Sequence, residues 1–171
     1  LGQLEVDDMA AAYQWAVDNG IAKPDEALPT GGSYGGYLTL QGLGKRPDLW
    51  AGGMASVAIA DPVPMYEDQA ETLRGYHRAL FGGSPDEKPE AHAASSPITY
   101  AEAVRAPVHI IQGSNDTRCP ARQLQVYEKK LQELKKPIEV HWFEAGHGSY
   151  ENEVQIDHQA RQMAFAYRVL G

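Results

Sequence analysis

The sequence predicts an α/β protein, built on a mostly parallel sheet with helices on both faces. Helical and strand patterns alternate along its 171 residues, and such an order is typical of parallel sheets. The clearest strand is 107–112, Pro-Val-His-Ile-Ile-Gln, and the clearest helix is 154–170, with apolar residues at helical spacing. A glycine-rich turn, Gly31–Gly36, joins a short extended segment to another helix. These three observations define the expected fold class.

The predicted elements start with a helix over 5–19, whose Asp7 and Asp8 suit the positive end of a helix dipole. Residues 26–30 form the expected strand before the glycine-rich turn, although Pro29 cannot donate a ladder hydrogen bond. The other expected elements are a helix over 34–45, a buried strand over 51–60, a helical excursion over about 63–105, a strand over 107–112, a helix from Pro120, a strand over 138–143 and a helix over 154–170. We expect one domain over residues 1–171.

The composition excludes several classes of partner. Apolar residues make up 43% of the chain and charged residues 22%, so it can bury an ordinary core. The formal net charge of −8 argues against nucleic acid and anionic membranes as main partners. No apolar run approaches the roughly 18 residues of a membrane span. The single cysteine, Cys119, rules out an internal disulfide, and we expect a cytoplasmic protein.

The turn Gly31-Gly32-Ser33-Tyr34-Gly35 fits G-x-S-x-G, the nucleophile elbow of α/β-hydrolases. Such a turn is tight, so side chains at Gly31 or Gly35 would be expected to collide with the neighbouring strand or helix. It lifts the Ser33 hydroxyl clear of the sheet. It also aims the Tyr34 backbone N–H at the place where an oxyanion would form. A plain glycine-rich turn is the alternative interpretation.

Two further loops complete a candidate catalytic set. Parallel strands place their carboxyl ends at one edge of a sheet, so loops that follow strands gather there. Asp116 follows the strand at 107–112, and His147 follows the strand at 138–143. The order Ser33, Asp116, His147 is the order of α/β-hydrolases. Asp61, which also follows a strand, is the alternative acid.

Other polar residues have less specific patterns. His141, Glu144 and His147 are evenly spaced but lack the helical two-histidine pattern of zinc proteases, so we predict no metal and no cofactor. Asp61 and Glu67 are candidates for binding a substrate amine. Cys119 is expected to be a small buried residue. The remaining histidines fall within predicted strands or helices: His77, His92, His109 and His158.

The segment Gly31–Thr39 resembles the nucleophile segment of the prolyl oligopeptidase family of serine peptidases, in its acylaminoacyl-peptidase and dipeptidyl-aminopeptidase-like branch. Further matches cover almost the whole chain: Asp8–Gly20, Pro47–Ala51, Leu80–Pro85, Ser96-Pro97, Pro107–Pro120 and Glu144–Ser149. The resemblance implies an α/β-hydrolase fold. It makes Ser33 the nucleophile, Asp116 the orienting acid and His147 the general base.

The resemblance also implies a reaction. The expected activity is cleavage of N-acylated or short peptides through an acyl-enzyme, with a peptide or small acyl compound as substrate. Hydrolysis of small esters, or a catalytically weak module that serves assembly, stay open as alternatives. The family's early strands, second oxyanion loop and β-propeller have no counterpart here. We therefore expect an α/β-hydrolase domain truncated at its N-terminus, which forms a homo-oligomer or needs a missing segment.

Overall fold

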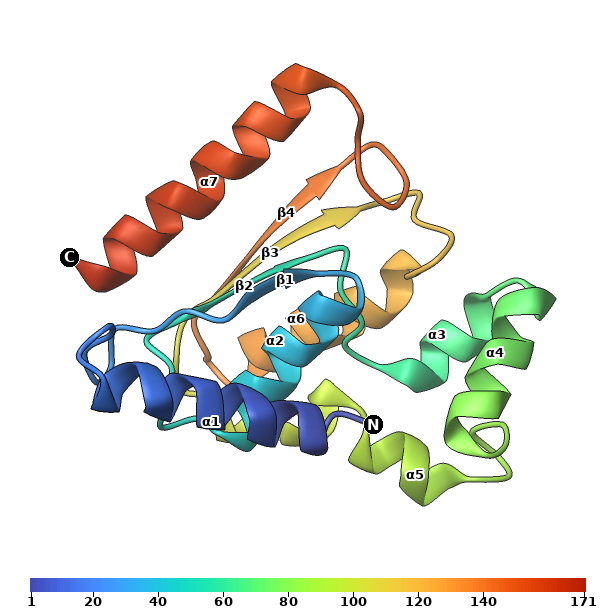
Figure 1. Cartoon of the computed structure of the whole chain (residues 1–171). Coiled ribbons are helices and arrows are strands. Elements are labelled where there is room, and N and C mark those ends of the chain that lie inside the picture. Colours follow the sequence, from blue (N-terminus) through green and yellow to red (C-terminus); the bar gives the residue numbers. More distant parts are fainter.

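The computed structural model describes residues 1–171 as a four-stranded parallel sheet flanked by helices (Figure 1). The strands lie in chain order, with β1 at one edge and β4 at the other. They are β1 (Thr30–Gly32), β2 (Gly53–Ser56), β3 (Val108–Gly113) and β4 (Ile138–Phe143), and every adjacent pair is parallel. Because each crossover is expected to be right-handed, the helices that connect the strands belong on one face.

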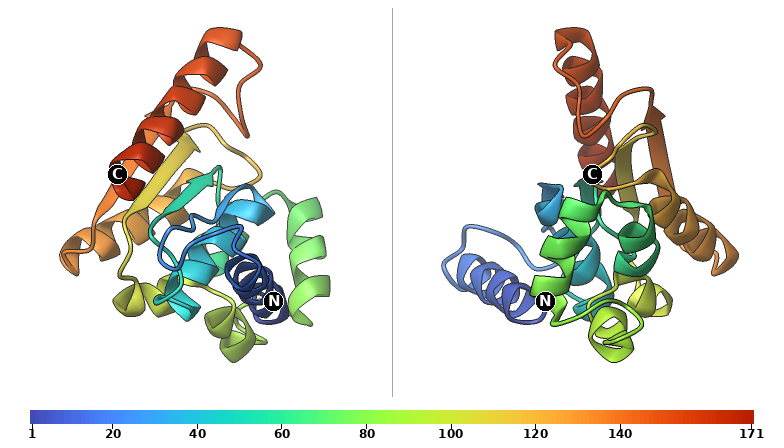
Figure 2. Two further views of the ribbon diagram at one scale, coloured as in Figure 1. Left: turned by 60° about the vertical axis from the view of Figure 1, so that its left-hand side comes forward. Right: turned by 90° about the vertical axis from the view of Figure 1, so that its right-hand side faces the viewer.

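The helices cover the two faces unequally. Figure 1 shows α2 and α6 on one face of the sheet and α7 across the other, and the views in Figure 2 agree. The helices are α1 (Leu4–Asp18), α2 (Tyr34–Lys45), α3 (Pro62–Asp68), α4 (Glu71–Phe81), α5 (Pro89–Ala94), the 3-10 helix η1 (Pro97–Ala103), α6 (Ala121–Glu133) and α7 (Asn152–Leu170). The expected fold class, with helices on both faces of a parallel sheet, is confirmed.

The segment before the glycine-rich turn differs from the prediction. The strand is Thr30–Gly32, not 26–30, so Pro29 lies just outside it. The Pro29 carbonyl accepts a hydrogen bond from the Met54 backbone N–H at 3.0 Å. The Pro29 carbonyl therefore adds one hydrogen bond to β2 just before β1 begins. Because the proline lies outside β1, its missing N–H removes no hydrogen bond from that strand. The strand predicted over 51–60 is also shorter, at Gly53–Ser56.

The main core lies between the sheet and the helices α2, α6 and η1. All six residues of β3 are buried, as expected for a central parallel strand. Leu40 and Leu43 of α2 and Leu124 of α6 are almost completely inaccessible to solvent. Side chains of the sheet and of these helices therefore pack against each other. This packing holds the carboxyl ends of the strands in place.

The other face is covered differently. The predicted apolar face of α7 points away from the sheet, since Ile156, Met163 and Tyr167 are 67%, 53% and 70% exposed. Phe165 is the buried residue of this helix. Arg168 of α7 forms an ion pair with Glu139 of β4 at 2.6 Å. The helix thus docks through Phe165 and polar contacts and leaves an apolar stripe in solvent. No helix combines the length and apolarity that crossing a membrane requires.

Candidate active site

Ser33 occupies a strained turn between β1 and α2. Its φ of 54° and ψ of −117° lie in a region that side-chain-bearing residues rarely adopt. The Ser33 N–H donates to the Ser56 carbonyl at 2.9 Å, and its own carbonyl accepts from the Tyr37 N–H at 2.9 Å. The Ser33 hydroxyl makes no capping bond to the helix. The backbone is therefore held at both ends while the hydroxyl is kept free of the helix.

Two glycines make this turn possible. A Cβ added at Gly31 would lie 2.5 Å from the Gly35 carbonyl carbon, as the motif predicts. A Cβ at Gly36 would lie 2.8 Å from the Ala58 Cβ. The prediction for Gly35 is wrong, because a Cβ there would meet nothing within 4 Å. Gly35 contributes the backbone that Gly31 must avoid, and its own side-chain position faces open space.

Tyr34 is the first residue of α2, so its backbone N–H has no acceptor within the helix. That leaves the N–H free to face a developing oxyanion beside Ser33. The Tyr34 phenol donates to Glu5 Oε1 at 2.7 Å and ties α1 to this turn. Burial and this hydrogen bond raise the pKa of Tyr34. The same bond lowers the pKa of Glu5, so the contact joins a neutral phenol to a carboxylate.

Asp116 and His147 form a direct pair. His147 Nδ1 lies 2.7 Å from Asp116 Oδ2. Asp116 Oδ1 accepts from the backbone N–H groups of Arg118 and Cys119 at 2.8 and 2.9 Å. The Asp116 side chain is 0% exposed and the His147 side chain 16%. A carboxylate can only accept, so Nδ1 carries the hydrogen and the Nε2 lone pair stays available as a base.

The acid and histidine loops are packed against each other. The Ser114 N–H donates to the Phe143 carbonyl at 2.9 Å, and the Asn115 N–H donates to the Ala145 carbonyl at 3.0 Å. A Cβ at Gly113 would lie 2.1 Å from the Gly146 carbonyl oxygen. Only a glycine allows the histidine loop to lie this close to the end of β3, and the contact brings His147 over Asp116.

Cys119 lies beside this pair. The ligand atoms of Asp116, Cys119 and His147 all lie within 4.8 Å of one another. Burial, followed by the charge of Asp116, raises the pKa of the Cys119 thiol to about 12. The structure therefore gathers Asp116, Cys119 and His147 in one cluster, and no hydrogen bond joins Ser33 directly to His147.

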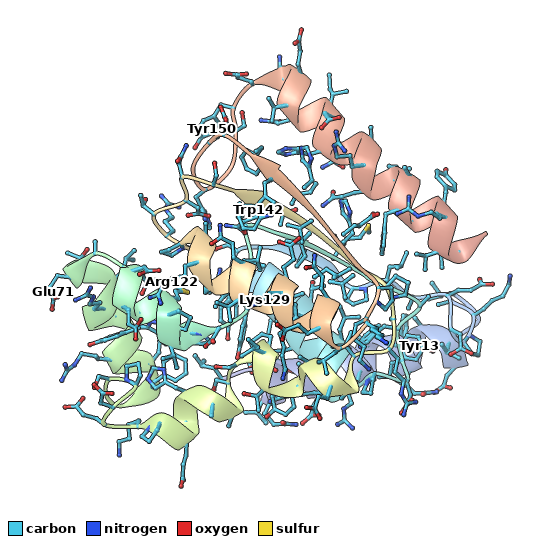
Figure 3. All side chains as sticks on the ribbon, turned by 180° about the vertical axis from the view of Figure 1, so that it is seen from behind. Tyr13, Glu71, Arg122, Lys129, Trp142 and Tyr150 are labelled. Carbon is cyan, nitrogen blue, oxygen red and sulfur yellow. The ribbon has the colours of Figure 1, made fainter.

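The other predicted site residues have partners within the protein. Asp61 caps α3 by accepting from the Val63 N–H at 3.1 Å, and burial raises the pKa of its carboxyl. Glu67 pairs at 2.6 Å with Arg122, which lies beside the green helices in Figure 3. Amine binding by Asp61 and Glu67 stays a prediction. His141 pairs with Asp157 at 3.6 Å, so it has a different carboxylate partner from His147.

A narrow apolar cavity opens beside the nucleophile turn. Its volume is about 80 Å³, well below the roughly 300 Å³ of a site for a whole small ligand, so it suits one side chain. Its walls come from the N-terminus, the start of α2, the segment after β2, α3 and α4: Leu1, Tyr34, Tyr37, Ile59, Pro62, Met65, Gln69, Leu73, Tyr76, His77, Leu80 and Phe81. Burial, with the neighbouring His92, lowers the pKa of His77 to about 4, so this wall is neutral at pH 7.

Residues 1–171 match the prolyl oligopeptidase family over their full length. The chain belongs to this family. It is 30% identical over 170 residues to dipeptidyl aminopeptidase BIII of Pseudoxanthomonas mexicana, covering 96% of this chain and 25% of that protein. It is 29% identical over 162 residues to an acylamino-acid-releasing enzyme of Arabidopsis thaliana, covering 82% of this chain and 19% of that enzyme. The chain thus spans about a quarter or less of these relatives.

Solved structures of other peptidases have the same fold. A puromycin-hydrolyzing peptidase from Mycobacterium tuberculosis superimposes with a TM-score of 0.92 at 29% identity, over 99% of this chain and 26% of that one. The acylaminoacyl peptidase of Pyrococcus horikoshii, at 24% identity, superimposes with a TM-score of 0.83 and supports the fold. The predicted family and the α/β-hydrolase fold class are confirmed.

One residue of this site was missed by the sequence analysis. Cys119 is buried as expected, yet its thiol also lies within 4.8 Å of the ligand atoms of Asp116 and His147. The available signal was its position three residues after Asp116 in the same loop. A loop that places one side chain in the active site can place a second side chain there three residues later. Its closeness to His147 depends on the contact between the acid and histidine loops.

Proposed function

We propose that this chain carries the catalytic triad of a serine peptidase, with Ser33 as nucleophile, His147 as general base and Asp116 as the orienting acid. Family membership supports a peptidase. The 2.7 Å contact between His147 Nδ1 and Asp116 Oδ2, beside a serine in a strained turn, carries the assignment of roles. Such an acid–histidine pair is what serine catalysis requires.

The reaction follows from the hydrogen-bond pattern. Asp116 keeps the hydrogen of His147 on Nδ1, so Nε2 accepts the proton of the Ser33 hydroxyl. For this step the Ser33 hydroxyl turns toward His147. The serine oxygen attacks the substrate carbonyl, and the oxygen that becomes negative is bound by the Tyr34 N–H. His147 then returns the proton to the leaving amine, and an activated water releases the acyl group from Ser33.

The proposed substrates are short or N-acylated peptides. The relatives include proteins named dipeptidyl aminopeptidase and acylamino-acid-releasing enzyme. The cavity beside Tyr34 is mostly apolar and has room for one side chain. We expect peptides with an apolar side chain next to the cleaved bond to react faster than those with a charged one.

A fluorophosphonate probe tests the proposal, since it reacts with an activated serine. We expect the folded chain to be labelled at Ser33, with labelling abolished in Ser33→Ala. Ser114→Ala is the matched control, because Ser114 is an exposed serine whose hydroxyl donates to the Phe143 carbonyl. Folded protein that the probe fails to label, or labelling that persists in Ser33→Ala, contradicts the proposal.

A second role, assembly between copies, is supported by two surfaces. Strand β1 lies at the edge of the sheet, where unpaired backbone groups invite pairing with another chain. The exposed apolar stripe of α7 adds a second contact surface. Light scattering tests this role, and a monomer at all accessible concentrations would contradict it.

A further inference from the structure

The side chains of Asp116, Cys119 and His147 form a cluster whose chemistry goes beyond proton transfer. Their carboxylate, thiol and imidazole atoms all lie within 4.8 Å of one another. Asp116 and Cys119 are buried, whereas the His147 ring is partly open to solvent. Serine catalysis requires the carboxylate and the imidazole but gives no role to a sulfur atom. The thiol is therefore the feature that needs an explanation.

Sulfur, nitrogen and carboxylate oxygen are the ligand types that zinc prefers in proteins. A tetrahedral zinc ion with bonds of about 2.0–2.3 Å would hold its ligand atoms roughly 3.3–3.8 Å apart. The Asp116 and His147 atoms, now 2.7 Å apart, open slightly to reach that spacing, and the Cys119 sulfur, within 4.8 Å of both residues' ligand atoms, has at most about 1 Å to close. A thiolate and a carboxylate together balance the charge of a divalent cation. A water is left to take the fourth position.

We propose that Asp116, Cys119 and His147 form an inhibitory binding site for a thiophilic divalent cation, with Zn²⁺ as the expected ion. Binding transfers the Cys119 thiol proton to solvent and forms a zinc–sulfur bond. The ion also takes an imidazole nitrogen of His147 and a carboxylate oxygen of Asp116. His147 can then no longer accept the Ser33 proton. The inhibition rests on the proposed peptidase function, whereas the binding does not.

The ion would inhibit catalysis because it competes with His147 for one oxygen of Asp116. Asp116 Oδ1 is held by two backbone N–H groups, so Oδ2 is the oxygen available to a metal. That same oxygen orients His147 in the metal-free site. Zinc and the catalytic hydrogen bond therefore draw on the same oxygen. The cation and the active triad exclude each other.

Cobalt titration of the whole chain tests the site directly. Cys119 is the only cysteine, so a thiolate-to-cobalt charge-transfer band in the near ultraviolet reports this one residue. We expect the band in the wild type, its loss on adding Zn²⁺, and no band in Cys119→Ser or Cys119→Ala. Thermal melts identify which variants are folded, and two variants are used in case one is not. A folded wild type that gives no band overturns the site.

Zinc affinity separates this site from surface histidines. We expect the Kd for Zn²⁺, measured by competition with a chromophoric chelator, to weaken by about 100-fold in the cysteine variants. His158→Gln is the control, because His158 lies beside His141 on the other side of the sheet. It should bind as the wild type does. A Kd that changes in His158→Gln but not in the cysteine variants overturns the proposal.

The consequence for catalysis has its own readout. We expect Zn²⁺ to slow fluorophosphonate labelling of Ser33 and a chelator to restore it. Unchanged labelling at saturating Zn²⁺ overturns the inhibition. A chain that shows the cobalt band but is never labelled, even without metal, refutes the peptidase function and leaves the binding site standing. The two failures are therefore distinguishable.

Discussion

The sharpest test of the triad is Asp116→Asn, because it changes one atom of a buried group. The asparagine oxygen can keep both backbone hydrogen bonds, from Arg118 and Cys119, that Asp116 Oδ1 accepts at 2.8 and 2.9 Å. The amide nitrogen replaces Oδ2, which lies 2.7 Å from His147 Nδ1. An amide nitrogen donates, so Nδ1 must become the acceptor. The imidazole hydrogen then moves to Nε2, and His147 can no longer take a proton from Ser33.

The expected effect is large on rate and small on stability. A wrong histidine tautomer in such a triad lowers kcat by about 10⁴-fold, or about 5.5 kcal/mol of transition-state stabilisation. The folded state keeps its backbone hydrogen bonds, so the melting temperature should stay close to that of the wild type. Asp116→Ala differs, because it leaves two buried N–H groups unpaired at about 1–3 kcal/mol each.

The assay is the rate of ester hydrolysis or of fluorophosphonate labelling, measured beside thermal melts of wild type, Asp116→Asn and Asp116→Ala. The expected pattern is a slow but stable asparagine variant and a slow, destabilised alanine variant. An asparagine variant within tenfold of the wild-type rate would refute the reasoning, since Asp116 would then not set the tautomer. A collapse in stability of the asparagine variant would instead show that its oxygen fails to replace Oδ1.

Three further predictions concern the fold and the self-association of the chain. Gly31→Ala should lower the free energy of unfolding by about 2–3 kcal/mol, because its Cβ would lie 2.5 Å from the Gly35 backbone. Gly35→Ala is the control and should leave the free energy of unfolding unchanged. Equal losses for the two variants in urea titrations would be inconsistent with the turn geometry. Burial lowers the pKa of His77 to about 4, so the unfolded chain takes up a proton near pH 6.5 while the folded one stays neutral. The free energy of unfolding should therefore fall between pH 6.5 and 4, and His77→Phe should flatten that fall in urea midpoints; identical pH profiles would contradict it. Replacing Met163 and Tyr167 of the exposed stripe by lysine should reduce self-association in light scattering, and an unchanged association state would exclude α7 as the contact.

The sequence could predict that the candidate site residues lie together at the carboxyl ends of the strands. This placement depends on the topology of the sheet more than on the details of side-chain packing. A parallel sheet brings the ends of β1, β3 and β4 to the same edge, so chain order alone places the loops of Ser33, Asp116 and His147 together. The hydrogen bond between Asp116 and His147 follows from the close contact of two loops across Gly113. The closeness of Cys119 to His147 depends on how the two loops pack, and no local pattern contains it.

One strand was misplaced and the direction of one helix face was left open, each for a physical reason. Two of the three residues of strand β1, Gly31 and Gly32, have little intrinsic strand preference, so the register of the strand is imposed by pairing with β2. In α7, helical spacing identified an apolar stripe and left its direction open. The helix contacts the sheet through Phe165 and the Arg168–Glu139 ion pair instead. Periodicity shows that a helix has two faces, and the partner decides which one is buried.

The close approach of Gly113 to the Gly146 carbonyl has a consequence for how such a catalyst can vary. In the proposed triad, the acid Asp116 and the base His147 are therefore held together by the ends of two neighbouring strands. Ser33, the proposed nucleophile, lies on a separate glycine-rich turn after β1. Substitutions that change turnover without disrupting the fold would then act mainly through the distance between the Asp116–His147 pair and the Ser33 hydroxyl.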